Sequence, residues 1–453
     1  MALSVVILAA GKGTRMKSTL PKVLHPLARK PLLEHVYDAA TELAAEEIVV
    51  VYGHGGEQVK QRCAHFSASW VEQAEQLGTG HAVQHALQAV NLNNDVLVLY
   101  GDVPLTRVDT LRQMMESMAD KIALLTVHLD NPFGYGRILR NAHDKVVGIV
   151  EQKDASAEQL AITEVNTGML AANGHVLKKY LDRIDNNNAQ GEYYLTDVFA
   201  LAAADGVEIQ TSHPRASFEV EGVNNRQQLA MLERVYQRNI ADELMLAGVT
   251  LADPARLDVR GKLNIEPDVF IDINVVLEGH VEIAGDVSIG ANSVIINSKI
   301  GAGVTIEPHC MIENAVIEAD VTIGPFARIR PGTHLQAKSK VGNFVEIKNA
   351  TIGEGSKVNH LSYVGDTEMG SNVNVGAGTI TCNYDGANKH KTIIGNNVFI
   401  GSDTQLVAPV RVGANATIGA GTTVTRDVDE DVLVISRSPQ KAINGWQRPT
   451  KNK

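Results

Sequence analysis

From Ile265 to Val424, an aliphatic residue returns at every sixth position of this chain. The register can be followed through Ile265, Ile271, Leu277, Ile283, Ile289 and Ile295. It then slips by one residue at Ile295 to Ile300, Ile312 to Ile317, Ile347 to Ile352 and Val364 to Met369, and otherwise holds through Ile418 and Val424. A period of six residues fits neither an amphipathic helix nor an alternating strand. It is typical of a solenoid in which three short strands and three tight corners form one triangular coil.

Each repeated aliphatic side chain is expected to point into the solenoid. Glycine often follows it, as in Ile289-Gly290, Ile300-Gly301 and Ile323-Gly324. We interpret the Gly, Asn or Asp that follows as a corner position, because these residues accept left-handed backbone conformations at low cost. Successive coils should stack at about the usual strand spacing, ~4.8 Å. The coils by themselves imply no chemistry, and they would also suit an inert spacer.

Length and charge limit what the rest of the chain can be. At 453 residues the chain is too long for a single core, so two or three domains are expected. The formal net charge is −11, and Arg448 to Lys453 is the only basic run. This balance argues against nucleic acid as the main partner.

Two further features indicate a cytoplasmic protein without membrane insertion. Cys63, Cys310 and Cys382 are odd in number and unclustered, so they predict neither a disulfide framework nor a paired-cysteine metal site. The apolar run Leu3 to Ala10 has no basic residues before it and is far shorter than the ~18 residues of a membrane span. It is predicted to be a buried strand.

A glycine-containing loop follows this strand. Ser4 to Ala9 leads into Ala10-Gly11-Lys12-Gly13-Thr14-Arg15-Met16, with Pro21-Lys22 shortly after. Strand, glycine loop and basic residues together are typical of a phosphate site. The loop lacks the third glycine of a dinucleotide fingerprint and the Gly-Lys-Ser/Thr of a Walker loop. A glycine-rich turn is more often a plain turn, but Arg15 and Lys22 favour a phosphate site.

Helices and strands alternate after this loop. Helical spacing is predicted at 30–45 and 79–90, and buried strands at 48–52 and 96–100. Asp102 follows the last of these strands, where open parallel sheets bind ligands, so it could hold a metal or equally cap a turn. Further predicted strands are Ile122 to Val127, Val146 to Glu151 and Glu164 to Gly168, and a predicted helix from Asn225 to Ala247 leads to the solenoid.

Several segments resemble those of known enzymes. They are Leu8 to Met16 with Pro21-Lys22, Gln73 to Gly80, Tyr100 to Pro104, Asn187 to Tyr194, and Asn374 to Gly386. The first resembles the signature of sugar-1-phosphate nucleotidyltransferases. Joined to a hexapeptide solenoid, the set makes the whole chain similar to the bacterial bifunctional N-acetylglucosamine-1-phosphate uridyltransferase / glucosamine-1-phosphate N-acetyltransferase family. At no motif position does the chain depart from that pattern.

The resemblance implies two domains and two reactions. It implies a Rossmann-like α/β nucleotidyltransferase domain with a mixed sheet over 1–226, a helical linker over 227–248, and a left-handed parallel β-helix with a C-terminal tail over 249–453. The solenoid would acetylate glucosamine-1-phosphate with acetyl-CoA as co-substrate. The N-terminal domain would then join N-acetylglucosamine-1-phosphate to UTP, releasing pyrophosphate. The product, UDP-N-acetylglucosamine, is a precursor of peptidoglycan and lipopolysaccharide, and a homotrimer with acetylation sites between solenoids is also expected.

The resemblance also assigns the nucleotide site. Arg15 and Lys22 should lie beside the phosphates, and Asp102 and Asn224 should hold Mg²⁺. Taken alone, Asn224 would more commonly be a helix N-cap. In-line attack on the α-phosphorus needs positioning and charge neutralisation but no covalent nucleophile. The implied sugar contacts are Gly136, Glu151 and Asn166, and the implied nucleotide contacts are Leu8, Ala9, Ala10, Gly11, Gln73, Gly78, Thr79, Tyr100 and Gly101.

In the solenoid, the resemblance implies His360 as the general base of acetylation, a role that suits imidazole. His360 is third in the hexapeptide that begins at Val358, and third positions one coil apart should stack along one edge. After Thr381 the register is interrupted by seven extra residues, predicted to be a loop that contains Asn383 and Tyr384. The stacked column then reads Asn343, His360, Ala377, Ser402 and Ala420.

Two groups of ligand contacts follow from the resemblance. Arg330 and Lys348, one coil apart on another edge, are candidate ligands of the sugar phosphate, although any single basic residue would more often be plain solenoid surface. Tyr363, Asn374 and Asn383 complete this site by resemblance. The implied acetyl-CoA contacts are Ala377, Asn383, Tyr384, Ser402, Ala420 and Arg437.

Three alternatives predict other functions. A single-activity nucleotidyltransferase with a structural or regulatory solenoid would not need His360, Lys348 or the Asn383-Tyr384 loop. A non-catalytic assembly subunit would not need Arg15, Lys22 and Asp102. A zinc-dependent anhydrase would need clustered histidines, but the solenoid histidines are scattered: they are His280, His309, His334, His360 and His390.

Overall fold

The chain forms two compact units, Met1–Tyr236 and Gln237–Lys453. A computed structural model describes residues 2–118 and 121–451. The boundary between the units lies within α8 (Arg226–Leu246). Across the described residues, every helix is too short or too polar to cross a membrane.

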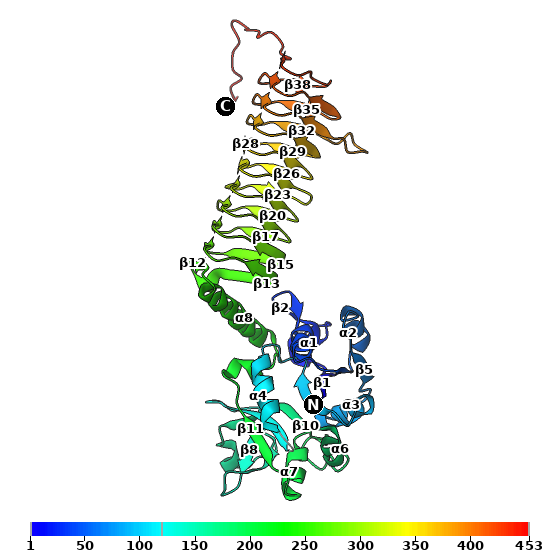
Figure 1. The fold of residues 1–453 in the computed structure, drawn as a ribbon. Helices are drawn as coiled ribbons and strands as arrows, with labels where there is room; N and C mark the ends of the chain where they lie inside the picture. The colour runs from blue at the N-terminus through cyan, green and yellow to red at the C-terminus, as the bar shows by residue number, and fades with distance from the viewer. Residues whose placement is uncertain (1, 119–120, 452–453) are drawn as a thin grey trace. The chain divides into compact units, whose positions relative to one another are not determined.

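The first unit is built on a mixed sheet (Figure 1). Its main path runs β11-β7-β10-β6-β1-β4-β5, with β8 and β9 attached to β10. β10 is antiparallel to both β6 and β7, whereas β1 is parallel to β4 and β6, so the expected mixed α/β sheet is confirmed. The strands are β1 (Leu3–Ala9), β4 (Glu47–Tyr52), β5 (Ser69–Glu72), β6 (Asp95–Tyr100), β7 (Ile122–His128), β8 (Arg137–Arg140), β9 (Val146–Val150), β10 (Glu164–Asn173) and β11 (Ile209–Ser212). A separate hairpin joins β2 (Pro26–Leu27) to β3 (Lys30–Pro31).

Helices cover both faces of this sheet. Every residue of β1 is buried, which explains its unbroken apolar run. Val6 packs in a core with α3, α6 and α7, whereas Val5 packs in a second core with α1, α2 and α4. The helices are α1 (Leu32–Glu42), α2 (Gly56–Arg62), α3 (Thr79–Ala86), α4 (Val108–Met118), α5 (Ala157–Leu160), α6 (Gly174–Leu181) and α7 (Asp197–Ala204). The 3-10 helices are η1 (Thr14–Met16), η2 (Lys22–Leu24), η3 (Leu87–Ala89) and η4 (Ser217–Val220), so the helix expected over 79–90 ends in a 3-10 turn.

The second unit is a parallel β-helix, as expected (Figure 1). One face carries β12 (Thr250–Leu251), β14 (Phe270–Ile271), β16 (Ser288–Ile289), β19 (Thr305–Ile306), β22 (Thr322–Ile323), β25 (Lys340–Asn343), β28 (Lys357–His360), β31 (Asn374–Val375), β34 (Phe399–Ile400), β37 (Thr417–Ile418) and β39 (Leu433–Val434). The second carries β17 (Val294–Ile296), β20 (Met311–Glu313), β23 (Arg328–Ile329), β26 (Glu346–Lys348), β29 (Tyr363–Gly365), β32 (Ile380–Cys382), β35 (Gln405–Val407) and β38 (Thr423–Val424). The third carries β18 (Lys299–Ile300), β21 (Val316–Ile317), β24 (His334–Leu335), β27 (Thr351–Ile352), β30 (Thr367–Met369), β33 (Thr392–Ile394) and β36 (Val410–Val412). The longer β13 (Leu257–Ile265) and β15 (Val275–Ile283) span the second and third faces, after the short η5 (Pro254–Arg256).

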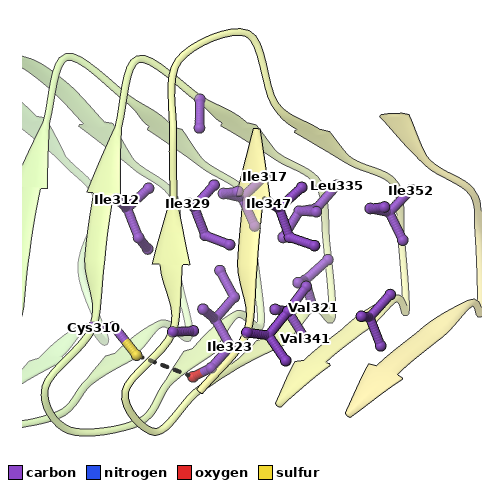
Figure 2. Packing of buried hydrophobic residues seen from close by; sticks show 14 of the residues in the cluster. Cys310, Ile312, Ile317, Val321, Ile323, Ile329, Leu335, Val341, Ile347 and Ile352 are labelled. Atoms are coloured by element: carbon purple, nitrogen blue, oxygen red, sulfur yellow. Dashed lines mark hydrogen bonds between the residues drawn. The ribbon is translucent and has the colours of Figure 1, made fainter. Parts of the chain in front are cut away.

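The repeated aliphatic residues form the core of the β-helix. Ile312, Ile329 and Ile347 come from successive coils and stack inside it (Figure 2), and each is 0 % exposed. Ile265, at the start of the pattern, is only partly buried. Burial of each such side chain contributes about 1.5–3 kcal/mol relative to exposure, so the period of six holds the solenoid together.

The one-residue slips have a structural cause. All four lie at the corner between the second and third faces, where the left-handed residue comes two positions after the aliphatic residue instead of three. These residues are Asn297, Asn314, Asn349 and Asp366, with φ between 44° and 48°. At the same corner of an unshortened coil, Gly332, with φ 79°, comes three positions after Ile329. The slips are therefore a tighter corner and not a break in the fold.

The interpretation of the glycines after the aliphatic residues is wrong for Gly290 and Gly301. Neither has a positive φ. A Cβ on Gly290 would lie 2.6 Å from the backbone nitrogen of Pro308 in the next coil, and one on Gly301 would lie 2.7 Å from the carbonyl carbon of Glu318. These glycines allow close stacking of coils, whereas left-handed corners occur two or three residues beyond the aliphatic. Gly324, with φ 99°, does have the expected conformation.

Candidate active sites

A cavity of about 250 Å³ opens at the carboxyl ends of β1 and β6 in the first unit. Open α/β sheets bind ligands at this edge. The cavity brings together most of the predicted nucleotide contacts. Its lining residues are Leu8, Ala9, Ala10, Gly11, Lys22, Val23, Gln73, Gln76, Gly78, Thr79, Ala82, Tyr100, Asp102 and Glu192. Gly101, also predicted, lies beside it and donates its backbone N–H to Leu8.

The glycine loop leaves this cavity open and draws Lys22 to its edge. Apart from its two chain neighbours, none of the described residues has an atom within 4 Å of the position a Cβ would take on Gly11. Gly13 has φ 59°, and a Cβ there would lie 2.6 Å from the Cβ of Lys22. Only glycine allows this approach without a shift of the backbone. The second glycine therefore positions the lysine.

Lys22, Asp102 and Asn224 meet at one point. The Lys22 ammonium is paired with Asp102 Oδ2 and lies 3.3 Å from Asn224 Oδ1. Arg15 donates from Nη2 to the same Asn224 oxygen at 2.8 Å. Two oxygens thus converge on a cation, with a second cation beside them, although these residues are far apart in sequence.

Asn224 is not the cap of the following helix. Asn225 has that position, since its Oδ1 accepts from the backbone N–H of Gln228, two residues inside α8. The side chain of Gln228 accepts from the backbone N–H of Asn224. The side-chain oxygen of Asn224 is therefore directed to Arg15 and Lys22.

The three predicted sugar contacts gather beside this cavity and do not line it. The backbone N–H of Asn166 donates to Gly136 at 2.9 Å, and a Cβ on Gly136 would lie 3.4 Å from Glu151 Oε1. Burial raises the pKa of Glu151, against the effect of a hydrogen bond from Thr196. Tyr100 is influenced by both regions. Burial raises the pKa of Tyr100, and the negative charges of Glu151 and Asp102 raise it further.

In the second unit, strand register aligns the predicted column. Val341 pairs with Val358, Val358 with Val375, Val375 with Ile400, and Ile400 with Ile418. The residues two positions beyond these are Asn343, His360, Ala377, Ser402 and Ala420. Arg437 reaches the last of them, donating from Nε to the carbonyl oxygen of Ala420 at 3.1 Å.

His360 is exposed and held by Asn343. Its Nδ1 lies 2.7 Å from Asn343 Oδ1 in the coil before. Because that oxygen only accepts, the imidazole proton is on Nδ1 and the Nε2 lone pair is left available. This is the tautomer that a general base requires.

Basic residues gather on the second face. Arg330 pairs with Glu346 at 2.6 Å, and Lys348 occupies the matching position one coil on. The nearby ammonium of Lys389 lowers the pKa of Lys348. Two cations this close would be stabilised by a phosphate between them.

The loop after β32 is fixed to the coil by Asn383. Asn383 is 7 % exposed, and its Nδ2 donates to Asp366 Oδ2 and lies 3.5 Å from the hydroxyl of Tyr363. Tyr384, in contrast, is 61 % exposed. Asn374 lies on the first face, where β31 pairs it with Lys357, away from this hydrogen-bond group.

Sequence reasoning missed three polar residues of these sites. Gln76 and Glu192 line the nucleotide cavity, and Lys389 adjoins Lys348. Gln76 and Glu192 belong to motif segments that were recognised, so the signal was present. Lys389 lies in the seven-residue insertion, where no register places a side chain.

One cluster of potential metal ligands lies elsewhere in the described part of the chain. Ligand atoms of His128, Glu164 and His213 all lie within 4.8 Å of one another. Both oxygens of Glu164 already accept from Arg140 at 2.8 Å. Among the described residues, none of the five β-helix histidines belongs to such a cluster.

Comparison with known proteins assigns a class to each unit. Residues 5–161 match the MobA-like NTP transferase domain, and residues 297–330 and 391–426 match the bacterial transferase hexapeptide (six repeats). A nucleotidyl transferase from Methanothermobacter thermautotroptrophicus is similar, with 20 % identity over 52 % of this chain and 99 % of that chain and a TM-score of 0.39. A UDP-glucose pyrophosphorylase complexed with UDP-glucose is similar with 17 % identity over 53 % of this chain and 100 % of that chain, with a TM-score of 0.43. The chain therefore combines a MobA-like NTP transferase domain with bacterial transferase hexapeptide repeats, and it has the features of a transferase.

Proposed function

We propose that this chain is a bifunctional enzyme that makes UDP-N-acetylglucosamine. The β-helix, 249–453, acetylates glucosamine-1-phosphate with acetyl-CoA, and residues 1–226 then transfer UMP from UTP to the product, releasing pyrophosphate. Residues 227–248 join the two domains. The observation that supports the proposal is that Lys22, Asp102 and Asn224 meet in the first unit, whereas Asn343 and His360 pair in register in the second.

The oxygens of Asp102 and Asn224 suit a magnesium ion. Mg²⁺ prefers oxygen ligands and is usually held by one or two protein groups together with substrate phosphates. Here the ammonium of Lys22 already bonds to both oxygens, so the pair is arranged around positive charge. When bound, the ion would neutralise charge on the triphosphate during in-line attack.

The protein groups around this point support nucleotidyl transfer. Arg15 and Lys22 would hold the phosphates by charge, and Gly11 leaves room for them. Glu151 and Asn166 would orient the sugar phosphate that attacks. The reaction forms a bond from the sugar-phosphate oxygen to the α-phosphorus and breaks the bond to pyrophosphate. No protein nucleophile takes part.

The tautomer of His360 supports the acetylation reaction. The glucosamine nitrogen attacks the thioester carbonyl, Nε2 of His360 takes a proton from that nitrogen, and the carbon–sulfur bond breaks to release CoA. Asn343 keeps the imidazole proton on Nδ1, and Lys348 with Lys389 would hold the sugar phosphate. Small side chains at Ala377, Ser402 and Ala420 leave an open edge for the pantetheine arm.

An exposed apolar ridge beside His360 favours assembly. Phe326, Phe344 and Leu361 are 47, 55 and 64 % exposed and have left-handed backbones with φ between 47° and 55°. The rings of Phe326 and Phe344 stack with centroids 5.2 Å apart. Large exposed apolar groups mark interfaces, and bulky residues with such backbones are strained. The ridge follows directly after the Asn343–His360 column, so a second copy packed on it would form the other side of the acetylation site. Three copies packed in this way would form a closed homotrimer.

One assay tests the proposal. Purified protein is incubated with glucosamine-1-phosphate, acetyl-CoA, UTP and Mg²⁺, and free thiol and pyrophosphate are followed separately. Both products should appear, with pyrophosphate lagging behind thiol. Pyrophosphate that depends on added N-acetylglucosamine-1-phosphate, without thiol release, would instead identify a single-activity nucleotidyltransferase.

A further inference from the structure

A chain of hydrogen bonds runs from the nucleotide cavity to two histidines of α3. Gln73 lines the cavity and is 3 % exposed. Its Nε2 lies 3.0 Å from the carbonyl oxygen of Gly78 and 3.2 Å from Nδ1 of His81. Nε2 of His81 lies 3.0 Å from Nε2 of His85.

The chemistry of these groups fixes the protons along the chain. The Gly78 carbonyl only accepts, so the Gln73 atom that faces it is the amide NH₂. An amide NH₂ only donates, so Nδ1 of His81 is unprotonated. The neutral ring of His81 therefore carries its proton on Nε2 and donates it to His85.

One atom of Gln73 is left for a ligand. Both amide protons are used by Gly78 and His81, whereas no group in the described ranges 2–118 and 121–451 donates to Oε1 of Gln73. That oxygen belongs to a side chain that lines the cavity. A ligand group placed against it must be a donor, since two facing acceptors leave both unpaired.

We propose that His81 is a positioning residue that holds Gln73 with Oε1 toward the base, and so selects uracil over cytosine. This inference rests on the proposed uridylyl transfer and adds the source of its base selectivity. Uracil presents an N–H at ring position N3, which Gln73 Oε1 can accept. Cytosine has an unprotonated ring nitrogen at the same place and would face Oε1 as a second acceptor. Sites built around such a hydrogen bond can reject the mismatched group strongly.

The surroundings of His81 favour its neutral form. His85 faces it from α3, Tyr193 stacks on it with ring centroids 6.2 Å apart, and Glu75 lies in the preceding loop. Burial and then His85 lower the pKa of His81 from its ordinary 6.5, whereas the backbone carbonyl and carboxylate of Glu75 oppose this. A proton on Nδ1 would set two donors against each other and release Gln73.

Calorimetric titration of the full chain with UTP and with CTP, each with Mg²⁺, tests the proposal. His81→Leu should weaken UTP binding about 10-fold and leave CTP binding unchanged, while kcat at saturating UTP changes less than about twofold, because only base positioning is lost. His81→Asn places an acceptor near the position of Nδ1 and should keep the preference for UTP. An unchanged UTP/CTP ratio in His81→Leu, or an equal loss in His81→Asn, would overturn the proposal.

A measurement on the wild-type protein covers the case in which these variants do not fold. The ratio of UTP to CTP affinity is measured from pH 7.5 down to pH 5.5, so that protonation of the shared triphosphate cancels. The ratio should fall as the pH drops through the lowered pKa of His81 and its ring gains a proton, and a constant ratio would contradict the proposal. If the wild-type protein preferred UTP in binding but transferred no uridylyl group, the proposed function would be refuted. The proposal that His81 sets the preference for uracil would still be supported.

Discussion

Asn343 and His360 stand opposite each other on adjacent coils of the β-helix, with Asn343 Oδ1 2.7 Å from His360 Nδ1. The asparagine oxygen accepts a hydrogen bond from the Nδ1–H of the imidazole, so Nε2 is the atom free to act as a base. This relationship depends only on register, because the coils pair Val341 with Val358 two residues earlier.

The first prediction is that Asn343→Leu lowers kcat of acetylation by about 10-fold. Without the acceptor the ring is free to place its proton on Nε2, and about 1.4 kcal/mol of transition-state stabilisation is lost. Thiol release at saturating substrates measures the effect. Asn343→Asp keeps an acceptor at this place and should retain most activity. Equal losses in the two variants would show that Asn343 has only a packing role.

The second prediction is that the two reactions are separable, because their groups lie in different units. Asp102→Asn removes the carboxylate that bonds Lys22 and should abolish pyrophosphate release, with thiol release unchanged. His360→Ala should have the opposite effect when N-acetylglucosamine-1-phosphate is supplied for the pyrophosphate assay. Both products are measured on the same preparation, with circular dichroism as a check of folding. Loss of both activities in either folded variant would refute two independent sites.

The period of six predicted the β-helix because each buried aliphatic residue constrains its own coil. Even the slips were visible, since the count drops by one where the left-handed Asn297 or Asp366 comes two positions after the aliphatic residue instead of three. The pattern did not reveal why Gly290 is glycine, because stacking against Pro308 is a contact between coils. The expected strands of the first unit were also found, but their order was not, since β10 pairs antiparallel between β6 and β7.

The candidate sites, like the fold, could be predicted from the sequence only in part. Motifs located Lys22, Asp102 and Gln73, because each stands at the end of a strand or in a loop that the motif contains. They did not show that Asn225 caps α8 and leaves Asn224 available, since neighbouring asparagines look alike in sequence. The sequence also did not reveal the chain of hydrogen bonds through His81, because that chain depends on interatomic distances around a buried amide.

The third prediction concerns the inserted loop. Lys389 lies close enough to Lys348 to lower its pKa, so a phosphate bound between the two ammonium groups would relieve their repulsion. Lys389→Ala should therefore raise KM for glucosamine-1-phosphate by about 5- to 10-fold with little change in kcat, as expected for loss of one charged contact to phosphate. Lys391→Ala is the matched control, because Lys391 pairs with Glu368. Similar KM increases in the two variants would contradict a specific role for Lys389.

The fourth prediction is a pH dependence of stability. Burial, with smaller contributions from Asp185, Glu151 and Asp154, raises the pKa of Asp197 to about 6 from 3.8. The folded state then binds this proton more tightly than the unfolded state, so stability falls as the pH rises from about 4 to 6. Asp197→Asn should reduce this fall by on the order of 1 kcal/mol. Scanning calorimetry of both proteins at pH 4 and pH 7 measures it, and parallel pH profiles would rule out this origin.

The fifth prediction is that acetylation requires the apolar ridge formed by Phe326, Phe344 and Leu361. Phe344→Asp places a charge beside a stacked ring, so copies packed on the ridge should separate. Thiol release should fall at least 10-fold, while pyrophosphate release from UTP and N-acetylglucosamine-1-phosphate persists. Light scattering during turnover should give the mass of a trimer for the wild type and a smaller mass for the variant. Leu246→Asp, at a side chain 89 % exposed at the end of α8, is the control for adding a charge to an exposed apolar position. A fully active monomer in either protein would refute a site that needs a second copy.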